Sequence, residues 1–186
     1  MVKKKACVFI SGSGTNLRSI IKSSRDYNFP IKVSLIVSNN KSARGILLAK
    51  KFSIPLICLD TNRYNFETIV LKNIIEKKID IILLAGFMRI LSKRFVRIFK
   101  NKIVNIHPSL LPKFKGLNTF KRVLNSKEKY TGCTVHYVDE KLDNGKIIVK
   151  RKISISDKDD IITLKKKVQL EEYKAYSNAI RKIFQI

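Results

Sequence analysis

The stretch ACVFISGSGTNLRSIIKSS, residues 6–24, is the part of the sequence that decides the fold. It begins with a short apolar run typical of a buried strand, turns through glycines and serines, and continues with the spacing of an amphipathic helix. The same succession recurs: strand-like runs occupy residues 31–38, 55–60, 80–86 and 103–107, and helical patterns occupy residues 43–52, 65–78 and 92–100. Buried strands that alternate with crossover helices predict a doubly wound α/β fold with a mostly parallel, Rossmann-like sheet.

The pattern changes after Gly116. A short helical segment at residues 118–126 precedes two strand-like runs, residues 131–140 and 146–156, and a last helix begins near Asp160. The Asp-Asn-Gly turn between the two runs predicts an antiparallel C-terminal extension of the sheet. Because the chain has 186 residues, is 45% hydrophobic and shows no linker or repeat, we expect a single domain over residues 1–186.

The composition is strongly basic, with 39 Lys and Arg residues against 14 Asp and Glu residues and a net charge of +25. Such a charge is typical of proteins that bind nucleic acid, a membrane surface or small anions. The chain is also rich in Lys, Ile and Asn, so A/T-biased codon usage explains the lysines equally well. The apolar run at residues 6–10 is shorter than a signal-peptide core, and no run is long enough to cross a bilayer. We therefore expect a cytoplasmic protein without a membrane partner.

The cysteines Cys7, Cys58 and Cys133 are widely spaced within apolar strand-like runs. This placement favours buried, reduced thiols over a disulfide. The chain has only two histidines and no Cys-x-x-Cys pair, so we expect no metal site.

The first strand-like run ends in ISGSGTNL, residues 10–17, at the sheet edge where open α/β sheets bind ligands. Its glycines allow a tight turn, and the helix that follows presents free N–H groups to an anion. Leu17 stands where the dinucleotide fingerprint has its third glycine, and no Gly-Lys-Ser/Thr occurs. A small phosphate ester therefore fits this loop better than a dinucleotide, and a turn that only starts the helix is the alternative.

A later strand end carries a single charged residue. Residues 80–85 form a continuous apolar run that releases into GFMRILS, in which Arg89 is the one charge. Such an arginine either holds a carboxylate or phosphate of a ligand or is simply solvated.

The last run of the α/β alternation leads into NIHPSLLPKFKG, residues 105–116. Period-two alternation places Asn105 and His107 on one face, where an amide and an imidazolium can together stabilise a carbonyl oxygen that gains negative charge. Asp143 is the candidate carboxylate that orients His107. A structural histidine is the alternative for His107, and it is the preferred interpretation of His136, which lies inside a strand-like run.

Five motifs in this order and spacing, which together cover nearly the whole chain, resemble the folate-dependent formyltransferases. They are ISGSGTNL, AGFMRIL, NIHPSLLPKFKGL, CTVHYVDEKLDNG and VQLEEYKAY. Within that family, the Gly-Thr-Asn of the first motif and the short length are similar to the glycinamide ribonucleotide enzymes of purine biosynthesis. The resemblance implies transfer of the formyl group of 10-formyltetrahydrofolate, as a co-substrate, to the amine of glycinamide ribonucleotide, without a metal or a covalent enzyme intermediate.

The resemblance also implies a role for individual residues. Asn105 and His107 would stabilise the tetrahedral intermediate, and Asp143 would favour the protonated form of His107 and help the proton leave the amine. The ribonucleotide would be held by Gly14, Thr15, Asn16 and Glu172, and the reduced folate by Arg63, Met88, Arg89, Ile90, Leu91, Val138, Asp139, Glu140, Lys141, Leu142 and Asp143. The implied partners are these small molecules and not nucleic acid, and both a monomer and a homodimer are compatible with the sequence.

The chain departs from the family pattern in two loops. Lys115 stands where a proline is usual, Asn118 and Phe120 replace frequent histidines, and Asn144 replaces a glycine. These departures leave Asn105, His107 and Asp143 in place and bear on the stiffness of the loops around them. The alternative functions are a methionyl-tRNA formyltransferase-like core, a formyltetrahydrofolate hydrolase, and a basic nucleic-acid-binding module on the same fold.

Overall fold

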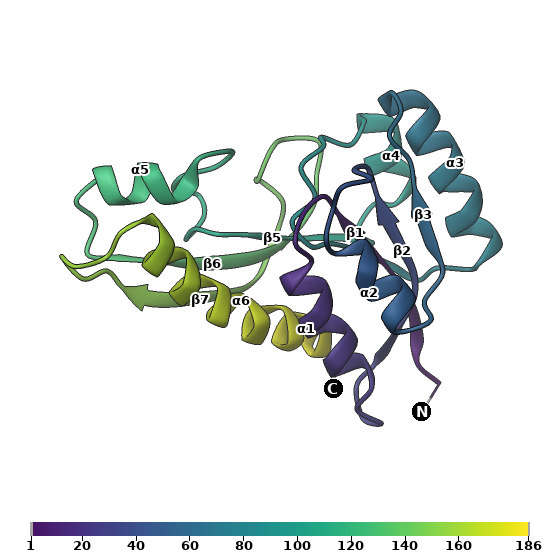
Figure 1. Cartoon of the computed structure of the whole chain (residues 1–186), viewed down its shortest axis with the longest axis horizontal. Coiled ribbons are helices and arrows are strands. Elements are labelled where there is room, and N and C mark those ends of the chain that lie inside the picture. Colours follow the sequence, from purple (N-terminus) through teal and green to yellow (C-terminus); the bar gives the residue numbers. More distant parts are fainter. Residues whose placement is uncertain (1, 186) are drawn as a thin grey trace. The chain divides into compact units, whose positions relative to one another are not determined.

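A computed structural model describes residues 2–185 and confirms the predicted architecture (Figure 1). The strands are β1 (Lys4–Ile10), β2 (Ile31–Ser38), β3 (Leu56–Cys58), β4 (Ile81–Leu84), β5 (Ile103–His107), β6 (Tyr130–Tyr137) and β7 (Ile147–Ser154). The helices are α1 (Thr15–Ser24), α2 (Ile46–Lys51), α3 (Arg63–Glu76), α4 (Lys93–Ile98), α5 (Thr119–Asn125) and α6 (Ile161–Ile183). Each of them overlaps a run or helical pattern that the sequence predicts.

Hydrogen bonding orders the strands β3-β2-β1-β4-β5-β6-β7. β1 pairs in parallel with both β2 and β4, and β2 pairs in parallel with β3. β6 and β7 are antiparallel, with Tyr130 opposite Ser154, which confirms the predicted C-terminal extension. The order reverses between β1 and β4, and this switch point is where doubly wound sheets bind their ligands.

The chain divides into two compact units, residues 2–104 and Asn105–Gln185. In the first unit, neighbouring residues of β1 face opposite sides of the sheet. The ring of Phe9 meets Phe66 of α3 edge-on, whereas the side chain of Ile10 lies beside Gly45, which precedes α2. Both faces of the sheet are therefore covered by helices, and the apolar character of β1 on both sides follows from that burial.

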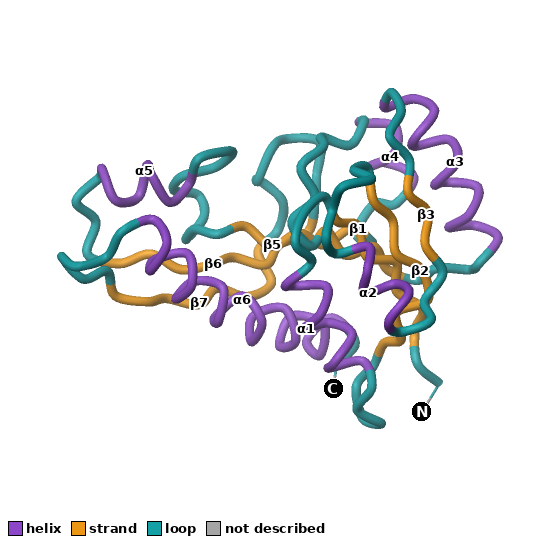
Figure 2. The backbone as a smooth tube through the Cα atoms, viewed as in Figure 1, coloured by secondary structure: helices purple, strands orange, loops and turns teal. Residues whose placement is uncertain are grey.

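The ends of β1 and β4 lie side by side within this unit. The Ser11 N–H donates to the carbonyl of Gly86 at 3.2 Å, and the Met88 N–H donates to the Ser11 hydroxyl at 2.8 Å. The Gly/Ser loop after β1 and the loop after β4 are thereby tied together at the switch point; Figure 2 shows both among the loops that follow the strands.

In the second unit, α6 packs on β6 and β7 through buried side chains that include Leu164, Val168 and Tyr176. The helix begins one residue after Asp160, whose side chain and that of Thr163 cap each other's backbone N–H groups. This reciprocal cap is the physical reason for the helix start that the sequence predicts near Asp160.

The three cysteines are free. Cys7 and Cys133 are buried as predicted, and burial, assisted by the negative charge of Glu172, raises the pKa of the Cys133 thiol to about 12. For Cys58 the predicted burial is wrong, because β3 is a short edge strand and leaves this residue half-buried. Over residues 2–185, no helix combines the length and apolarity required to span a membrane.

Candidate active site

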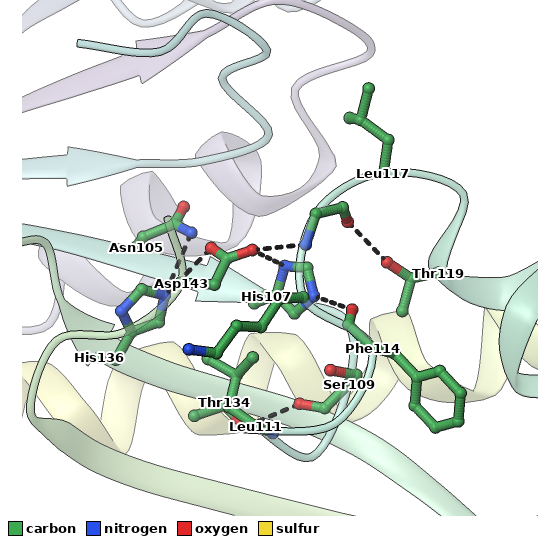
Figure 3. Close-up of polar contacts among 12 residues, drawn as sticks. Asn105, His107, Ser109, Leu111, Phe114, Leu117, Thr119, Thr134, His136 and Asp143 are labelled. Carbon is green, nitrogen blue, oxygen red and sulfur yellow. Dashed lines mark hydrogen bonds and ion pairs between the residues drawn. The ribbon is translucent and has the colours of Figure 1, made fainter. Parts of the chain in front are cut away.

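His107 and Asp143 come together in the second unit. His107 is the last residue of β5, and Asp143 lies in the loop between β6 and β7, where its backbone adopts a left-handed φ of 47°. The Oδ2 atom of Asp143 lies 3.3 Å from Nδ1 of His107, and each side chain is only 7% exposed (Figure 3). An ion pair shielded from water in this way has a stronger interaction than one on the surface.

The carboxylate of Asp143 is held from a second side. Its Oδ2 atom also accepts a 2.8 Å hydrogen bond from the backbone N–H of Gly116. Its Oδ1 atom lies 3.7 Å from Nε2 of His136 (Figure 3). The carboxylate is therefore fixed between two imidazole rings and the loop that follows β5.

His107 faces hydrogen-bond acceptors at both ring nitrogens. Nε2 lies 2.8 Å from the carbonyl oxygen of Phe114, and Nδ1 faces the carboxylate of Asp143. A carbonyl and a carboxylate can only accept, so the ring can donate to both only when both nitrogens carry a hydrogen. The surroundings of His107 thus suit an imidazolium that donates hydrogen bonds.

His136 and Asn105 form a second chain of contacts. Nδ1 of His136 lies 2.9 Å from the carbonyl oxygen of Tyr137, so this nitrogen carries the hydrogen of the neutral ring. Nε2 is then an acceptor, and Nδ2 of Asn105 lies 3.3 Å from it. Burial lowers the pKa of His136 below its ordinary value of 6.5, against the opposing effects of the Tyr137 carbonyl and Asp143. A neutral His136 therefore orients the amide of Asn105.

The sequence interpretation of His136 as a purely structural residue missed this contact with Asn105. The residue is buried, as a structural histidine would be, but it lies at an irregularity of the β6–β7 pairing, where the register shifts between Val135 and His136. One sequence signal could have placed it here: His136 lies in the strand-like run that leads into the predicted turn containing Asp143.

The loop after β5 is anchored on β6. Thr134, a buried residue of β6, donates its hydroxyl hydrogen to the carbonyl of Ser109 at 2.7 Å and accepts from the N–H of Leu111 at 3.0 Å. Ser109 in turn donates to the carbonyl of Lys113 at 2.6 Å. These bonds satisfy buried polar groups and fix the start of the loop that carries Phe114 and Gly116.

Two of the departures from the family pattern contact each other. The Nζ atom of Lys115 donates to Oδ1 of Asn144 at 2.8 Å, and Nδ2 of Asn144 lies 3.3 Å from Oδ2 of Asp139. The Lys115–Asn144 bond links the same two loops that the Gly116–Asp143 bond links. The two loops are thus joined by a side-chain bridge as well as by the bond from the Gly116 N–H to Asp143.

The phosphate-loop candidates lie in the first unit. Gly14 has a left-handed φ of 74°, and its carbonyl accepts from the N–H of Arg18, so it forms the N-terminal cap of α1. Thr15 and Asn16 are the first two residues of that helix, and Asn16 is buried. Gly14 is also tightly packed, because a Cβ atom there would lie 2.6 Å from the Cα atom of Gly45.

The folate candidates of the first unit differ in exposure. Met88 and Ile90 are exposed by 71% and 66%, Leu91 is buried, and Arg63 is an exposed residue at the start of α3. Arg89 is half-buried in the loop after β4. Its guanidinium donates to the carbonyl of Thr61 at 2.8 Å and lies 5.1 Å from the ring centre of Phe66, so it joins the loop after β4 to the start of α3.

The remaining candidates lie in the second unit. The loop from Val138 to Asp143 is half-buried at its start and exposed at Leu142, and its backbone bends where the N–H of Lys141 donates to Asp139. Glu172 is a buried residue of α6, and burial, together with the negative charge of Glu172, raises the pKa of Tyr176. Across the described residues, 2–185, no three His, Cys, Asp or Glu side chains are grouped so as to hold a metal ion.

Comparison with known proteins identifies the family. The sequence model of the formyl transferases matches residues 4–180. The chain belongs to the formyl transferase family. It is 36% identical to the phosphoribosylglycinamide formyltransferase of Haemophilus influenzae, in an alignment that covers 96% of this chain and 86% of that protein.

Two further comparisons are informative. This formyl transferase is 39% identical to the trifunctional purine biosynthetic protein adenosine-3 of Bos taurus, with 96% of the chain aligned; it spans only 18% of that much longer relative. Its fold is similar to the crystal structure of phosphoribosylglycinamide formyltransferase from Bacillus halodurans, with a TM-score of 0.92, 36% identity and coverage of 97% of this chain and 95% of the other. The family membership confirms the resemblance on which the sequence analysis relied.

Proposed function

We propose that the chain transfers the formyl group of 10-formyltetrahydrofolate to the amine of glycinamide ribonucleotide, a step of purine biosynthesis. The observation that carries the proposal is the fixed arrangement of His107 between the Phe114 carbonyl and the Asp143 carboxylate, with Asn105 in contact with His136 nearby. The names of the Haemophilus influenzae and Bacillus halodurans relatives support this choice of reaction.

The reaction requires the protein to stabilise a developing negative charge and to help a proton transfer. As the amine nitrogen attacks the formyl carbon, the formyl oxygen gains negative charge, and hydrogen-bond donors aimed at that oxygen lower the barrier. Asn105 supplies an amide N–H donor for it, and His107 supplies its Nε2–H when this hydrogen is transferred from the Phe114 carbonyl, which it faces in the ligand-free chain, to the formyl oxygen. The attacking amine then loses a proton, which the Asp143 carboxylate can accept, and the departing folate nitrogen takes up a proton as its bond to the formyl carbon breaks.

Substrate binding is assigned to the residues that the resemblance implies. Gly14, Thr15, Asn16 and Glu172 hold the ribonucleotide, and the folate lies against Arg63, residues 88–91 and residues 138–143. Arg89 donates one guanidinium N–H to the Thr61 carbonyl, and a guanidinium has four further N–H donors for a ligand. We place the reaction in the cytoplasm, in a single domain without a metal, and leave monomer and homodimer as alternatives.

One assay tests the reaction against its rivals. Purified protein is mixed with 10-formyltetrahydrofolate and either glycinamide ribonucleotide, charged initiator tRNA or no acceptor, and the folate absorbance is followed. We expect turnover only with glycinamide ribonucleotide, and loss of that turnover in His107→Ala. Turnover with tRNA or with water alone would replace the proposal by a methionyl-tRNA formyltransferase-like or a hydrolase function.

A further inference from the structure

A basic hollow between α1 and α2 is distinct from the residues assigned to the reaction, except that Thr15 lines its wall. The hollow encloses about 420 Å³ in the first unit and is lined by Ser13, Thr15, Arg18, Arg44, Leu47, Leu48 and Lys51. Volumes of this order are typical of small-molecule sites. Figure 1 shows the two helices; Ser13 precedes α1, and Arg44 precedes α2.

The cations of the hollow are not neutralised by the protein. Within residues 2–185, no carboxylate lies within ion-pair distance of Arg18, Arg44 or Lys51. Elsewhere, basic side chains such as Lys113, Arg151 and Lys167 do find acidic partners. Three cations gathered around one concavity repel each other, and an anion bound among them relieves that repulsion.

The walls of the hollow are both polar and apolar. The hydroxyls of Ser13 and Thr15 can donate to the oxygens of an anion. Leu47, in contrast, is 66% exposed although it is a large apolar residue, and Leu48 lies beside it. A ligand that satisfies the whole lining has an anionic end and an apolar part.

The hollow is held in shape by contact between two glycines. The N–H of Gly45 donates to the carbonyl of Gly12 at 3.0 Å, and any side chain at Gly14 would collide with Gly45. The loop that carries Ser13 is thereby fixed against the residue next to Arg44. A site whose walls are fixed before binding loses less conformational entropy when it is occupied.

We propose that this hollow binds a nucleoside phosphate, with the phosphates among Arg18, Arg44 and Lys51 and the base against Leu47. Thr15 is shared with the loop assigned to the ribonucleotide, whereas Arg18, Arg44, Lys51 and Leu47 have no assigned part in the formyl transfer reaction. Binding is therefore tested without turnover.

The test is calorimetric titration of ADP into the full chain at about 0.15 M salt, where diffuse surface attraction is screened. Arg18→Gln, Arg44→Gln and Lys51→Gln are combined in one variant, and Lys32→Gln, Lys41→Gln and Lys50→Gln form the control variant. The control residues are exposed cations of the same unit that do not line the hollow, so both variants lose the same charge. We expect the first variant to bind ADP roughly 10- to 100-fold more weakly and the control to match the wild type.

A second titration separates a nucleotide from a bare anion. Leu47→Ala is expected to weaken ADP binding by roughly three- to tenfold while leaving the affinity for pyrophosphate unchanged, because only the nucleotide has a base to place on Leu47. Absence of saturable ADP binding to the wild type, or an equal loss in the two charge variants, would overturn the site. An ADP affinity that does not respond to Leu47→Ala would overturn its assignment to nucleotides.

Discussion

Nε2 of His136 lies 3.3 Å from Nδ2 of Asn105 and accepts its hydrogen bond, while Nδ1 of His136 is held by the Tyr137 carbonyl at 2.9 Å. The histidine that lies inside β6 thus fixes the orientation of the amide that we assign to the formyl oxygen. His136 is in this sense a positioning residue: it acts on the reaction through Asn105.

The first prediction follows from this contact. His136→Leu removes the acceptor for the Asn105 amide, and we expect kcat to fall by roughly 10- to 100-fold, part of the loss that a missing oxyanion donor causes, with KM for both substrates little changed. His136→Gln offers a side-chain oxygen to Asn105 and should recover much of kcat. Steady-state kinetics on the three proteins decides the matter; equal rates in the Leu and Gln variants would mean that the amide is oriented by other contacts.

The second prediction concerns the neutral state of His136 and the pH dependence of stability. Since burial lowers its pKa in the folded chain below 6.5, the unfolded chain binds more protons at this site once the pH falls below that value. The free energy of unfolding should therefore decrease as the pH falls through about 6.5 towards the folded-state pKa. Urea unfolding at about pH 7.5 and about pH 5.5 measures this loss, and His136→Gln, which has no proton to bind, should show a smaller one. If the unfolding free energy of the wild type and of His136→Gln decreased equally between the two pH values, groups other than His136 would be responsible for the decrease.

The third prediction concerns Asp143 and Asn105. Asp143→Asn keeps the shape of the side chain but removes the charge that faces Nδ1 of His107, and single-turnover formyl transfer at neutral pH should slow by ~10²–10⁴-fold. Asn105→Ala should slow it by ~10²–10³-fold. The double variant should lose less than the product of the two factors, because residues that act as a unit are not additive. Thermal melts show whether each variant still folds, and a folded Asp143→Asn variant with the wild-type rate would exclude Asp143 from the reaction.

The fourth prediction separates two glycines of the loop after β1. Gly14→Ala places a side chain at a left-handed φ and within 2.6 Å of Gly45, whereas a Cβ at Gly12 meets nothing within 4 Å. We expect Gly14→Ala to lose at least roughly 1–2 kcal/mol of unfolding free energy, together with affinity for glycinamide ribonucleotide, and Gly12→Ala to keep the wild-type stability. Denaturant melts and calorimetric titrations measure both quantities. Equal stability of the two variants would contradict the packing of Gly14 on Gly45.

The fifth prediction concerns the bridge between the loops that follow β5 and β6. Lys115→Ala and Asn144→Ala each remove the 2.8 Å bond between these side chains, so each should raise KM for the folate by a small factor. The double variant should be no worse than the more damaging single variant, with a coupling of roughly 0.2–1 kcal/mol, as for other partly exposed polar pairs. If the increase in KM of the double variant equalled the product of the two single increases, Lys115 and Asn144 would act independently.

Much of this protein is determined by local sequence pattern. The alternation of apolar runs and helical segments predicts every strand from β1 to β5, because a buried strand and an amphipathic helix each impose a period that is readable over a few residues. The helical pattern that follows residue 160 predicts α6, and the period of two predicts that Asn105 and His107 share a face of β5.

The tertiary structure alone decided how distant segments meet. That Arg89 is occupied by Thr61, that Lys115 reaches Asn144, and that His136 orients Asn105 depend on loops whose paths are fixed by contacts far apart in the sequence. The same holds for the charged hollow, since Arg18 of α1 and Arg44, in the turn before α2, line it together, where Gly14 packs on Gly45. A local sequence pattern reveals the periodicity of one helix or strand. The position of a side chain in a site depends instead on how several elements pack together, and long-range contacts determine that packing.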